Sequence, residues 1–471
     1  MRDFIECFLD DEYISGHDNI VRRLYPAYKL RWNPVLRPEH PWEMADPPAM
    51  TAPSVVKHVG SADIAMYYRC RGARDGRWMV CMAESADGRS WHKPALEIHR
   101  SGIKGDRTNI LVRVPDGIDE ILSFWVLRNP YPEESYIFLA LVETLDEDGR
   151  RSAHVLGSMD AIHWDISRKH TFLTRQGDAR PSLLRCDDGL FRAFILADAG
   201  SGFRTIDAMC STDLVDWSAP ESLLSITDED AVSGVRLMGM NPTKLGPFYL
   251  GLLSVSAAGC AGGDSAGPAR LELAFSRDGA RWGRVCPGCA FVEPGEPGSW
   301  DAGMVCQSSG LFEIGNAWLL TYGAGAESGE SNPPLNIGVA WTERGRIIGI
   351  HQADSERCGT LITTPVALEG GNLIINADNA RGIRISLLTD DNQPVAGAAA
   401  ANSRLGRKDD CRWIVTWEDA TGAESFNAAA CPKPLKICFE ISGGAVLHAF
   451  ETAHEQGRPY QVNIRDFSRP S

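Results

Sequence analysis

The chain has 471 residues, with 47 Lys and Arg against 62 Asp and Glu, which gives a net charge of −15. Hydrophobic residues make up 44% and charged residues 23%, the composition of a globular protein that buries a large core. This balance excludes a disordered or collagen-like chain. The excess of carboxylates also argues against nucleic acid or an anionic membrane as a partner. We therefore expect a neutral or weakly charged ligand.

The N-terminus and the cysteines predict a compartment. Asp3, Glu6 and Asp10 stand where a secretory signal would need a positive start and an apolar run. No run of the sequence reaches the ~18 apolar residues of a membrane span. The 13 cysteines are odd in number and scattered, which favours a reducing cytoplasm over a disulfide framework. Cys286-Pro-Gly-Cys289 has CxxC spacing, but Pro-Gly predicts a turn there rather than redox or zinc chemistry.

A motif of the form Ser-x-Asp-x-x-x-Trp occurs four times, at residues 85–91, 158–164, 211–217 and 276–282. A degenerate fifth copy covers residues 342–345. Each copy follows a run of β-type residues, and the copies recur every roughly 50 to 70 residues. The motif predicts a hairpin in which Asp accepts from backbone N–H groups and Trp folds back over the sheet.

Repeats of this size with three or four strands suit the blades of a propeller. We predict an all-β fold, a five-bladed β-propeller followed by a C-terminal β-sandwich. Residues 1–44 would pack on the propeller as a strand and a Pro-rich segment, 45–356 would form the catalytic propeller, and 357–471 the sandwich. The alternative is two β-sandwiches in which the motif copies are coincidental turns.

A propeller brings the start of the first strand of each blade to one mouth of a central channel. An acid precedes each predicted blade, namely Asp46, Asp106, Asp178, Glu229 with Asp230, and Asp301. Carboxylates that share one mouth cannot all ionise at their ordinary pKa values. Glycosidic cleavage needs such a set, because one carboxyl protonates the leaving oxygen while another activates water or attacks. Each acid could instead be a turn or cap residue.

Other residues near these positions are candidates for binding substrate. Arg107 and Arg180 could clamp a hydroxyl or carboxylate, or pair with the acids, and Trp42 and Trp300 could stack on a sugar or pack between blades. The predicted substrate-binding set is Glu43, Trp42, Arg107, Asn109, Arg180, Glu229, Asp230 and Trp300. The 11 histidines are dispersed, so no metal site is predicted. No cofactor is expected, and a structural cation in the channel stays open.

Several segments resemble the five-bladed β-propeller glycoside hydrolases of families 32, 43, 62 and 68. They are residues 33–36 (Asn-Pro-Val-Leu), 41–43 (Pro-Trp-Glu), the turn at 85–91, and 298–304 (Gly-Ser-Trp-Asp-Ala-Gly-Met). The likeness spans most of the chain, but its motifs are structural. It implies that Asp46, Asp106 and Asp178 hold the base or nucleophile, the auxiliary acid and the general acid. The third is usually Glu, and the catalytic boxes of family 32 are not found as such.

We predict a glycoside hydrolase or transglycosidase that cleaves a small furanoside, such as a fructosyl or arabinosyl oligosaccharide, with catalytic acids Asp46, Asp106, Asp178 and Asp301. A glycoside phosphorylase is an alternative and would need a cationic phosphate subsite, for which Lys104, Arg107 and Arg180 are candidates. A non-catalytic carbohydrate-binding propeller is another. The predicted partner is a small carbohydrate, not nucleic acid or a membrane. The sugar, the stereochemical outcome and the oligomeric state stay open.

Overall fold

The computed structural model describes residues 4–46, 49–59, 62–73, 76–96, 98–100, 107–114, 118–129, 136–164, 169–175, 177, 179–200, 203–258, 266–326, 335–368, 371–409 and 411–453. These residues are nearly all β, and α1 (Asp228–Val232) is the one α-helix among them. No helix in this part of the chain is long and apolar enough to cross a bilayer. The chain divides into two compact units. Unit 1 holds the residues up to Pro26 and those from Thr342 on, and unit 2 holds Ala27–Trp341.

Three separate four-stranded antiparallel sheets make up the first part of unit 2. The first consists of β5 (Met50–Val59), β6 (Ala62–Arg71), β7 (Trp78–Ser85) and β8 (Ile110–Val112). The second consists of β9 (Ile118–Arg128), β10 (Phe138–Asp146), β11 (Arg151–Ser158) and β12 (His170–Arg175). The third consists of β13 (Ser182–Arg185), β14 (Phe191–Gly200), β15 (Phe203–Ser211) and β16 (Glu221–Leu224).

A nine-stranded sheet holds two further groups of strands. The fourth group is β17 (Arg236–Leu245), β18 (Phe248–Ala258), β19 (Ala266–Ser276) and β20 (Gly283–Val285). The fifth is β21 (Met304–Ser308), β22 (Phe312–Ile314), β23 (Ala317–Gly325), β24 (Asn336–Glu343) and β4 (Tyr28–Lys29). A parallel pair between Ala269 and Met304 joins the two groups. Because β4 precedes the first group in the chain, its pairing with β24 ties the last group to the start of unit 2.

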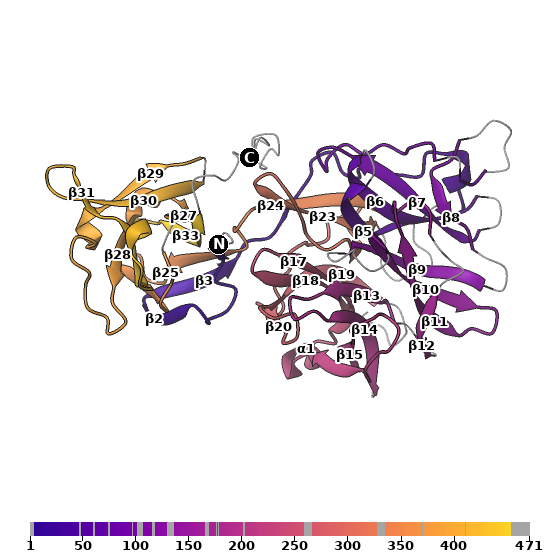
Figure 1. The fold of residues 1–471 in the computed structure, drawn as a ribbon. Helices are drawn as coiled ribbons and strands as arrows, with labels where there is room; N and C mark the ends of the chain where they lie inside the picture. The colour runs from indigo at the N-terminus through magenta and orange to yellow at the C-terminus, as the bar shows by residue number, and fades with distance from the viewer. Residues whose placement is uncertain are drawn as a thin grey trace. The chain divides into compact units, whose positions relative to one another are not determined.

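The first strands of the five groups contact one another in a ring (Figure 1). β5 contacts β9, β9 contacts β13, β13 contacts β17, β17 contacts β21, and β21 contacts β5. Hydrogen bonds join neighbouring groups close to these inner strands, from β6 to β9 and from β13 to β17. Arg69, opposite Thr51 of β5, donates from Nη1 to the Ile121 carbonyl of β9 at 2.6 Å, and Ser182 of β13 donates to the Met240 carbonyl of β17 at 2.7 Å. The starts of the inner strands therefore converge.

The Ser-x-Asp-x-x-x-Trp copies form the turns predicted for them. Asp278 Oδ1 accepts from the backbone N–H groups of Ala280 and Arg281, both at 2.8 Å. Ser276 Oγ accepts from Gly279 N at 2.8 Å, and Trp282 Nε1 donates to the Gly279 carbonyl at 2.9 Å. The same four kinds of contact recur around Asp87. These bonds fix the hairpin and fold the indole back over it.

Two copies of the motif have a larger residue in place of the glycine. Ala161 and Leu214 hold positive φ values of 61° and 67°, a strained conformation for side chains with a Cβ. In these copies Trp164 and Trp217 have no hydrogen-bond partner for Nε1 among the described residues. The turn therefore tolerates the loss of glycine, but the indole bond is kept only in the copies that retain it.

Unit 1 contains two sheets, one in the order β29-β30-β27-β33-β25-β3 with β1 and β31 attached, the other in the order β2-β26-β32-β28. Its strands are β1 (Phe4–Glu6), β2 (Ile14–Asp18), β3 (Ile20–Leu24), β25 (Ile348–Gln352), β26 (Gly359–Thr363), β27 (Asn372–Asp378), β28 (Ile383–Leu388), β29 (Ser403–Arg407), β30 (Arg412–Glu418), β31 (Glu424–Phe426), β32 (Lys436–Ile441) and β33 (Val446–Ala453). Short 3-10 helices cover Ala380–Gly382, Ala400–Asn402 and Ala428–Ala430.

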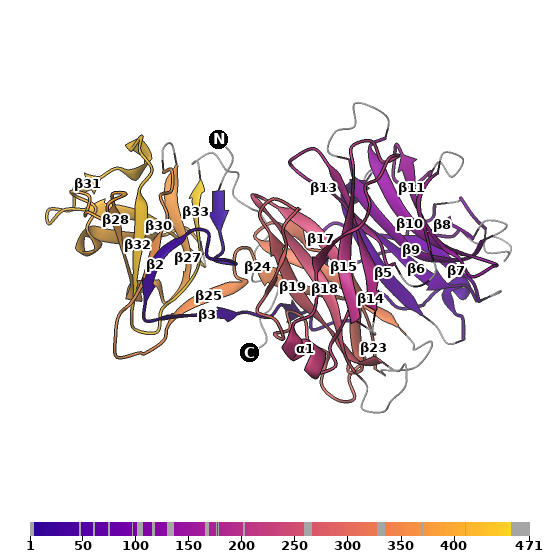
Figure 2. The same ribbon diagram turned by 90° about the horizontal axis from the view of Figure 1, so that it is seen from below.

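The N-terminal segment divides differently from the sequence prediction, which packed residues 1–44 on the propeller. β1 pairs with β33, β2 with β26 and β3 with β25, so all three strands lie in unit 1. Figure 1 draws β3, in indigo, beside β25, and Figure 2 shows the indigo strands among the orange and yellow ones. The sequence prediction placed one strand in this segment, whereas three form, and the strands they pair with lie more than 300 residues away.

The start of the second group is also later than the sequence suggested. Asp106 was placed before the second blade, yet the strand that follows it, β8, pairs with β7 as the last strand of the first group. The second group begins at Ile118 with β9. Asp106 itself lies outside the described residues.

We predict that the turn acids contribute pH-dependent stability. Burial opposes ionisation of Asp278, but the bonds from Arg281 and Ala280 outweigh it and lower its pKa. A group with a depressed folded pKa stabilises above its ordinary value and loses that contribution as the pH falls. Asp278→Ala should therefore cost about 1 to 2 kcal/mol at pH 7, and less at pH 3. Thermal unfolding followed by circular dichroism measures both, with Asp278→Asn as the milder control. An equal loss at both pH values would contradict the prediction.

Candidate active site

Three predicted binding residues form a buried polar network in the first strand group. Trp42 and Glu43 lie on the 3-10 helix η1 (Pro41–Glu43). The Glu43 carboxylate accepts from the Tyr68 hydroxyl at 2.6 Å and from Lys93 Nζ at 2.7 Å. Asn109 donates to the Tyr68 oxygen at 2.5 Å and accepts from Trp42 Nε1 at 3.2 Å. These contacts hold η1 against the strands and leave Trp42 buried rather than open to a sugar.

Asp301 is also buried and paired. Its Oδ2 atom lies 2.5 Å from Lys29 Nζ of β4 and accepts from the Tyr322 hydroxyl at 3.3 Å. Burial, and then the Asp301 charge, raise the pKa of Tyr322 well above its usual value. The Trp300 ring stacks on Tyr322 with centroids 5.9 Å apart. The ion pair thus ties the outer strand β4 to the segment before β21.

Asp230 of α1 is also buried and paired with a cation, as Asp301 is. It forms a capping box with Thr227 and contacts the Arg284 guanidinium. Burial opposes ionisation of Asp230, but the bonds from Arg284 and Thr227 outweigh it and lower the pKa. Asp46, Arg107 and Glu229 are exposed. Asp106, Asp178 and the phosphate-site candidate Lys104 lie outside the described residues.

The backbone is irregular near the start of every inner strand. Register shifts interrupt β5, β9, β17 and β21, and the segment before β13 contains a non-glycine residue with φ of 40°. The residues concerned are Ala52 and Pro53 on β5, Leu122 on β9, Arg180 before β13, Met238 on β17 and Gln307 on β21. Bulges turn side chains to new directions and are frequent beside active sites. Irregular backbone therefore occurs on four of the inner strands and in the segment directly before the fifth, β13.

A pocket of about 50 Å³ lies at three of these irregularities. Its lining residues are Leu122, Ser123, Trp125, Arg180, Pro181, Met238, Gly239, Asn241 and Ser254. On β9 and again on β17, two consecutive residues line the pocket, whereas consecutive residues of a regular strand face opposite sides. Each bulge therefore lets two neighbouring residues of its strand line the pocket instead of one. Of the site residues predicted from sequence, Arg180 is the one that lines this pocket among the described residues.

Arg180 and Ser123 contribute polar groups to the lining of the pocket. Arg180 donates from Nη1 to the Met238 carbonyl at 3.0 Å, which connects the start of β13 to the bulge of β17. Burial raises the pKa of the Cys306 thiol to about 11, and the Arg180 charge acts against this shift, so the guanidinium lies within electrostatic reach of β21. Ser123 Oγ is buried and has no hydrogen-bond partner among the described residues. A buried hydroxyl of this kind is suited to bonding a ligand.

A buried carboxylate, Glu143 of β10, has a pocket-lining residue as its cross-strand neighbour. Glu143 lies directly opposite Ser123 in the β9–β10 register and is 1% exposed. Its Oε1 atom accepts from the Ala179 N–H at 3.2 Å and lies 3.7 Å from Arg151 Nη1. In the sequence, Glu143 stands out only as a further acid, like Glu84, whose position is less informative than those of the acids before the blades. A single charge within the apolar run 138–145 is the signal that marks it, since a buried charge needs a compensating reason.

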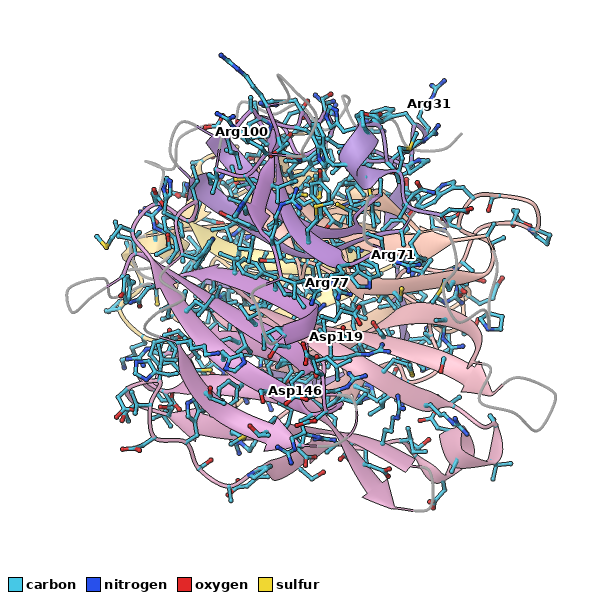
Figure 3. All side chains as sticks on the ribbon, turned by 90° about the vertical axis from the view of Figure 1, so that its right-hand side faces the viewer. Arg31, Arg71, Arg77, Arg100, Asp119 and Asp146 are labelled. Carbon is cyan, nitrogen blue, oxygen red and sulfur yellow. The ribbon has the colours of Figure 1, made fainter. Side chains whose placement is uncertain are left out.

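A second acid, Glu120, lies on the inner strand β9. Burial raises the pKa of the half-buried Glu120 carboxyl, and the charges of Arg69 and Arg151 offset this only in part. Glu120 and Arg151 both lie opposite Leu145, on either side of β10. Figure 3 shows the neighbouring Arg77 and Asp119, which are joined by a bond from Arg77 Nε to the Asp119 carbonyl at 3.3 Å. Several charged side chains therefore lie near Glu120 at this end of the second group.

No protein-family model and no curated protein matches the chain. It is similar to solved structures of a β-1,2-mannobiose phosphorylase from Listeria innocua (TM-score 0.49, 12% identity, 69% of this chain and 98% of that one) and of a GH62 α-L-arabinofuranosidase catalytic domain from Coprinopsis cinerea (0.43, 13%, 67% and 98%). Sucrose-6-phosphate hydrolase from Lactobacillus gasseri gives 0.38 and 11%, over 86% and 91%. A likeness at this level carries no function across, so the site is argued from its own residues.

The described residues contain no group of three His, Cys, Asp or Glu side chains that could hold a metal ion. What the arrangement offers instead is general acid–base chemistry. Glu143 provides a buried carboxylate opposite the pocket residue Ser123, and the raised pKa of Glu120 provides an acid that keeps its proton to a higher pH than usual.

We predict that Asp301 and Lys29 depend on each other. Asp301→Asn and Lys29→Met should each destabilise the protein by about 2 kcal/mol, less than for a fully buried pair because Lys29 keeps some exposure. The double variant should lose less than the two single losses combined. Thermal unfolding of the four proteins measures the coupling. Strict additivity would show that the ion pair is not a stabilising unit.

We also predict that Glu120→Gln stabilises the protein at neutral pH. Since the folded pKa is raised above the ordinary 4.5, protonated Glu120 is favourable at low pH, and this contribution is lost as the pH rises through the folded value. The gain from Gln should therefore be absent at pH 3.5 and present at pH 7. Unfolding midpoints across this range test it. A gain that is largest at low pH would contradict the sign.

Proposed function

We propose that unit 2 is a five-bladed β-propeller and that the two sheets of unit 1 form a β-sandwich. The ring of contacts β5–β9–β13–β17–β21 supports the propeller, because five inner strands that each touch two neighbours enclose a central channel. The pairing of β4 with β24 supports it further, since an early strand that completes the last blade closes the circle.

We propose that the chain is a glycoside-processing enzyme, and that hydrolysis of a small glycoside is its reaction. The observation that carries this is the buried Glu143 carboxylate, held by the Ala179 N–H beside a pocket at the bulged ends of the inner strands. Cleavage of a glycosidic bond needs a carboxylate so placed, together with a second carboxyl in a different environment. The furanoside substrate inferred from sequence stays part of the proposal.

The second carboxyl is proposed from four acids. Glu120 has a raised pKa on the same blade. Asp178 precedes the pocket residue Arg180 by two positions, and Asp46 and Asp106 are retained from the sequence prediction. Asp301 is assigned a structural role instead, because its carboxylate is engaged by Lys29 and Tyr322. In this proposal Glu143 activates water or attacks the anomeric carbon, and the protonated partner supplies the leaving oxygen with its proton.

The test is the turnover of a panel of small aryl glycosides by Glu143→Gln. We expect a loss of roughly 100-fold or more, because the neutral amide can neither take a proton nor attack. Glu221→Gln, an exposed acid at the start of β16 outside the pocket, is the matched control and should keep full activity. Circular dichroism shows whether Glu143→Gln is folded. A folded variant with turnover equal to that of the control would overturn the assignment of Glu143.

Asp46→Asn, Asp106→Asn, Asp178→Asn and Glu120→Gln, measured on the same panel, identify the partner. One of them should lose activity together with the alkaline limb of the pH–rate profile, since that limb reports the group that must be protonated. Four variants with unaltered profiles would show that the general acid lies elsewhere.

A further inference from the structure

The pocket differs in charge from the chain as a whole. The chain carries 15 more acids than bases. Yet among the residues that line the pocket in the described part of the chain, the charged side chain is a cation, Arg180. A second guanidinium supports the same wall from behind, because Arg204 Nη1 lies 3.5 Å from the Met238 sulfur. Arg180 therefore offers a positive partner to an anion in this pocket, next to the Glu143 carboxylate that lies opposite Ser123.

The backbone conformation of Arg180 and one hydrogen bond from its side chain fix the position of the guanidinium. Its φ of 40° is rare for a residue with a side chain, and its Nη1 bond to the Met238 carbonyl holds the guanidinium at the bulge of β17. Gly239, with φ of 143°, follows that bulge, and a Cβ there would lie 3.7 Å from both Cβ and Cδ of Arg180. Strained backbone maintained by surrounding structure is characteristic of functional sites.

The size and remaining groups of the pocket fit a compact oxyanion. One water needs roughly 10–15 Å³ of such volume, so about 50 Å³ admits a group of a few heavy atoms rather than a chain of sugars. Ser123 Oγ is a buried hydroxyl without a partner among the described residues. Guanidinium together with hydroxyl and amide groups is the donor set that recognises carboxylate and phosphoryl oxygens.

We propose that this pocket binds a compact oxyanion, a carboxylate or phosphoryl group, and that Arg180 recognises it. This rests on the proposed glycoside-processing function and names the substrate class of that site: a sugar with an acidic substituent, or a sugar together with free phosphate. It replaces the neutral ligand expected from net charge. An acidic sugar and free phosphate would present the same kind of charged oxygen to Arg180. Binding measurements with each of them tell the two apart.

The experiment is isothermal titration calorimetry of the full chain with four probes: inorganic phosphate, glucose 6-phosphate, glucuronate and glucose. We expect at least one acidic probe to bind more tightly than glucose by roughly tenfold or more, the size of one charge-assisted hydrogen bond. Phosphate alone would identify a free-phosphate site. Glucuronate or glucose 6-phosphate without phosphate would identify an acidic sugar.

Arg180→Asn removes the charge with a residue that tolerates positive φ better than most. Arg180→Asn should bind the acidic probes no more tightly than glucose, and Arg180→Lys should retain part of the difference. Arg236→Gln, an exposed arginine of β17 outside the pocket, is the control and should bind as the parent does. Equal binding of glucose and the acidic probes, no binding of any acidic probe at millimolar concentration, or an unaltered preference in folded Arg180→Asn would each overturn the proposal. Turnover by Glu143→Gln is measured separately from these titrations. A failure of the catalytic assignment can therefore be told apart from a failure of the oxyanion site.

Discussion

Unit 2 depends on contacts between five inner strands, each of which touches the next until the last meets the first. Hydrogen bonds between neighbouring strands fix their relative height, such as the bond from Ser182 of β13 to the Met240 carbonyl of β17. Because the strands share this alignment, an irregularity near the start of each one meets the others at a single end. The bulges at Leu122 and Met238 and the strained Arg180 therefore widen the same opening, and the pocket follows from the ring.

Burial decides which acids are available for chemistry. A buried charge is tolerated only when it is paired or hydrogen-bonded. Glu43 meets this requirement through Tyr68 and Lys93, and Asp301 meets it through Lys29. These two acids therefore stabilise the segments that precede the strands. Glu143 is buried as deeply and is engaged as well, by the Ala179 N–H and by Arg151, but it differs from the other two acids in that its cross-strand neighbour, Ser123, lines the pocket.

Much of the local structure could be predicted from the sequence. The runs 205–210 and 336–341 lie within the strands β15 and β24, and the turn acids bond the backbone as the motif requires. Long-range partners were not predictable in this way. One strand was predicted near the N-terminus, where β1 lies, but β2 and β3 were not, and nothing local indicates that these strands complete sheets with β33, β26 and β25.

The candidate site was less accessible to sequence reasoning than the fold. Acids that precede strands were visible, but their ion-pair partners, such as Lys29 for Asp301, come from distant positions. Bulges leave no clear trace in a pattern of alternating residues, so the contribution of Leu122 and Met238 to one pocket was hidden. Net charge did not reveal the position of Arg180 either, because the sum over the whole chain conceals a local cation.

The central claim is that substrate binds at the bulged ends of the inner strands, with Glu143 and Arg180 beside it. A crystal structure of the inactive Glu143→Gln protein with a bound small glycoside tests this most directly. The account predicts that the glycosidic oxygen lies next to residue 143 and that a substituent enters the pocket lined by Ser123, Arg180 and Met238. A glycoside bound on unit 1, or elsewhere on unit 2 with the pocket empty, would contradict it.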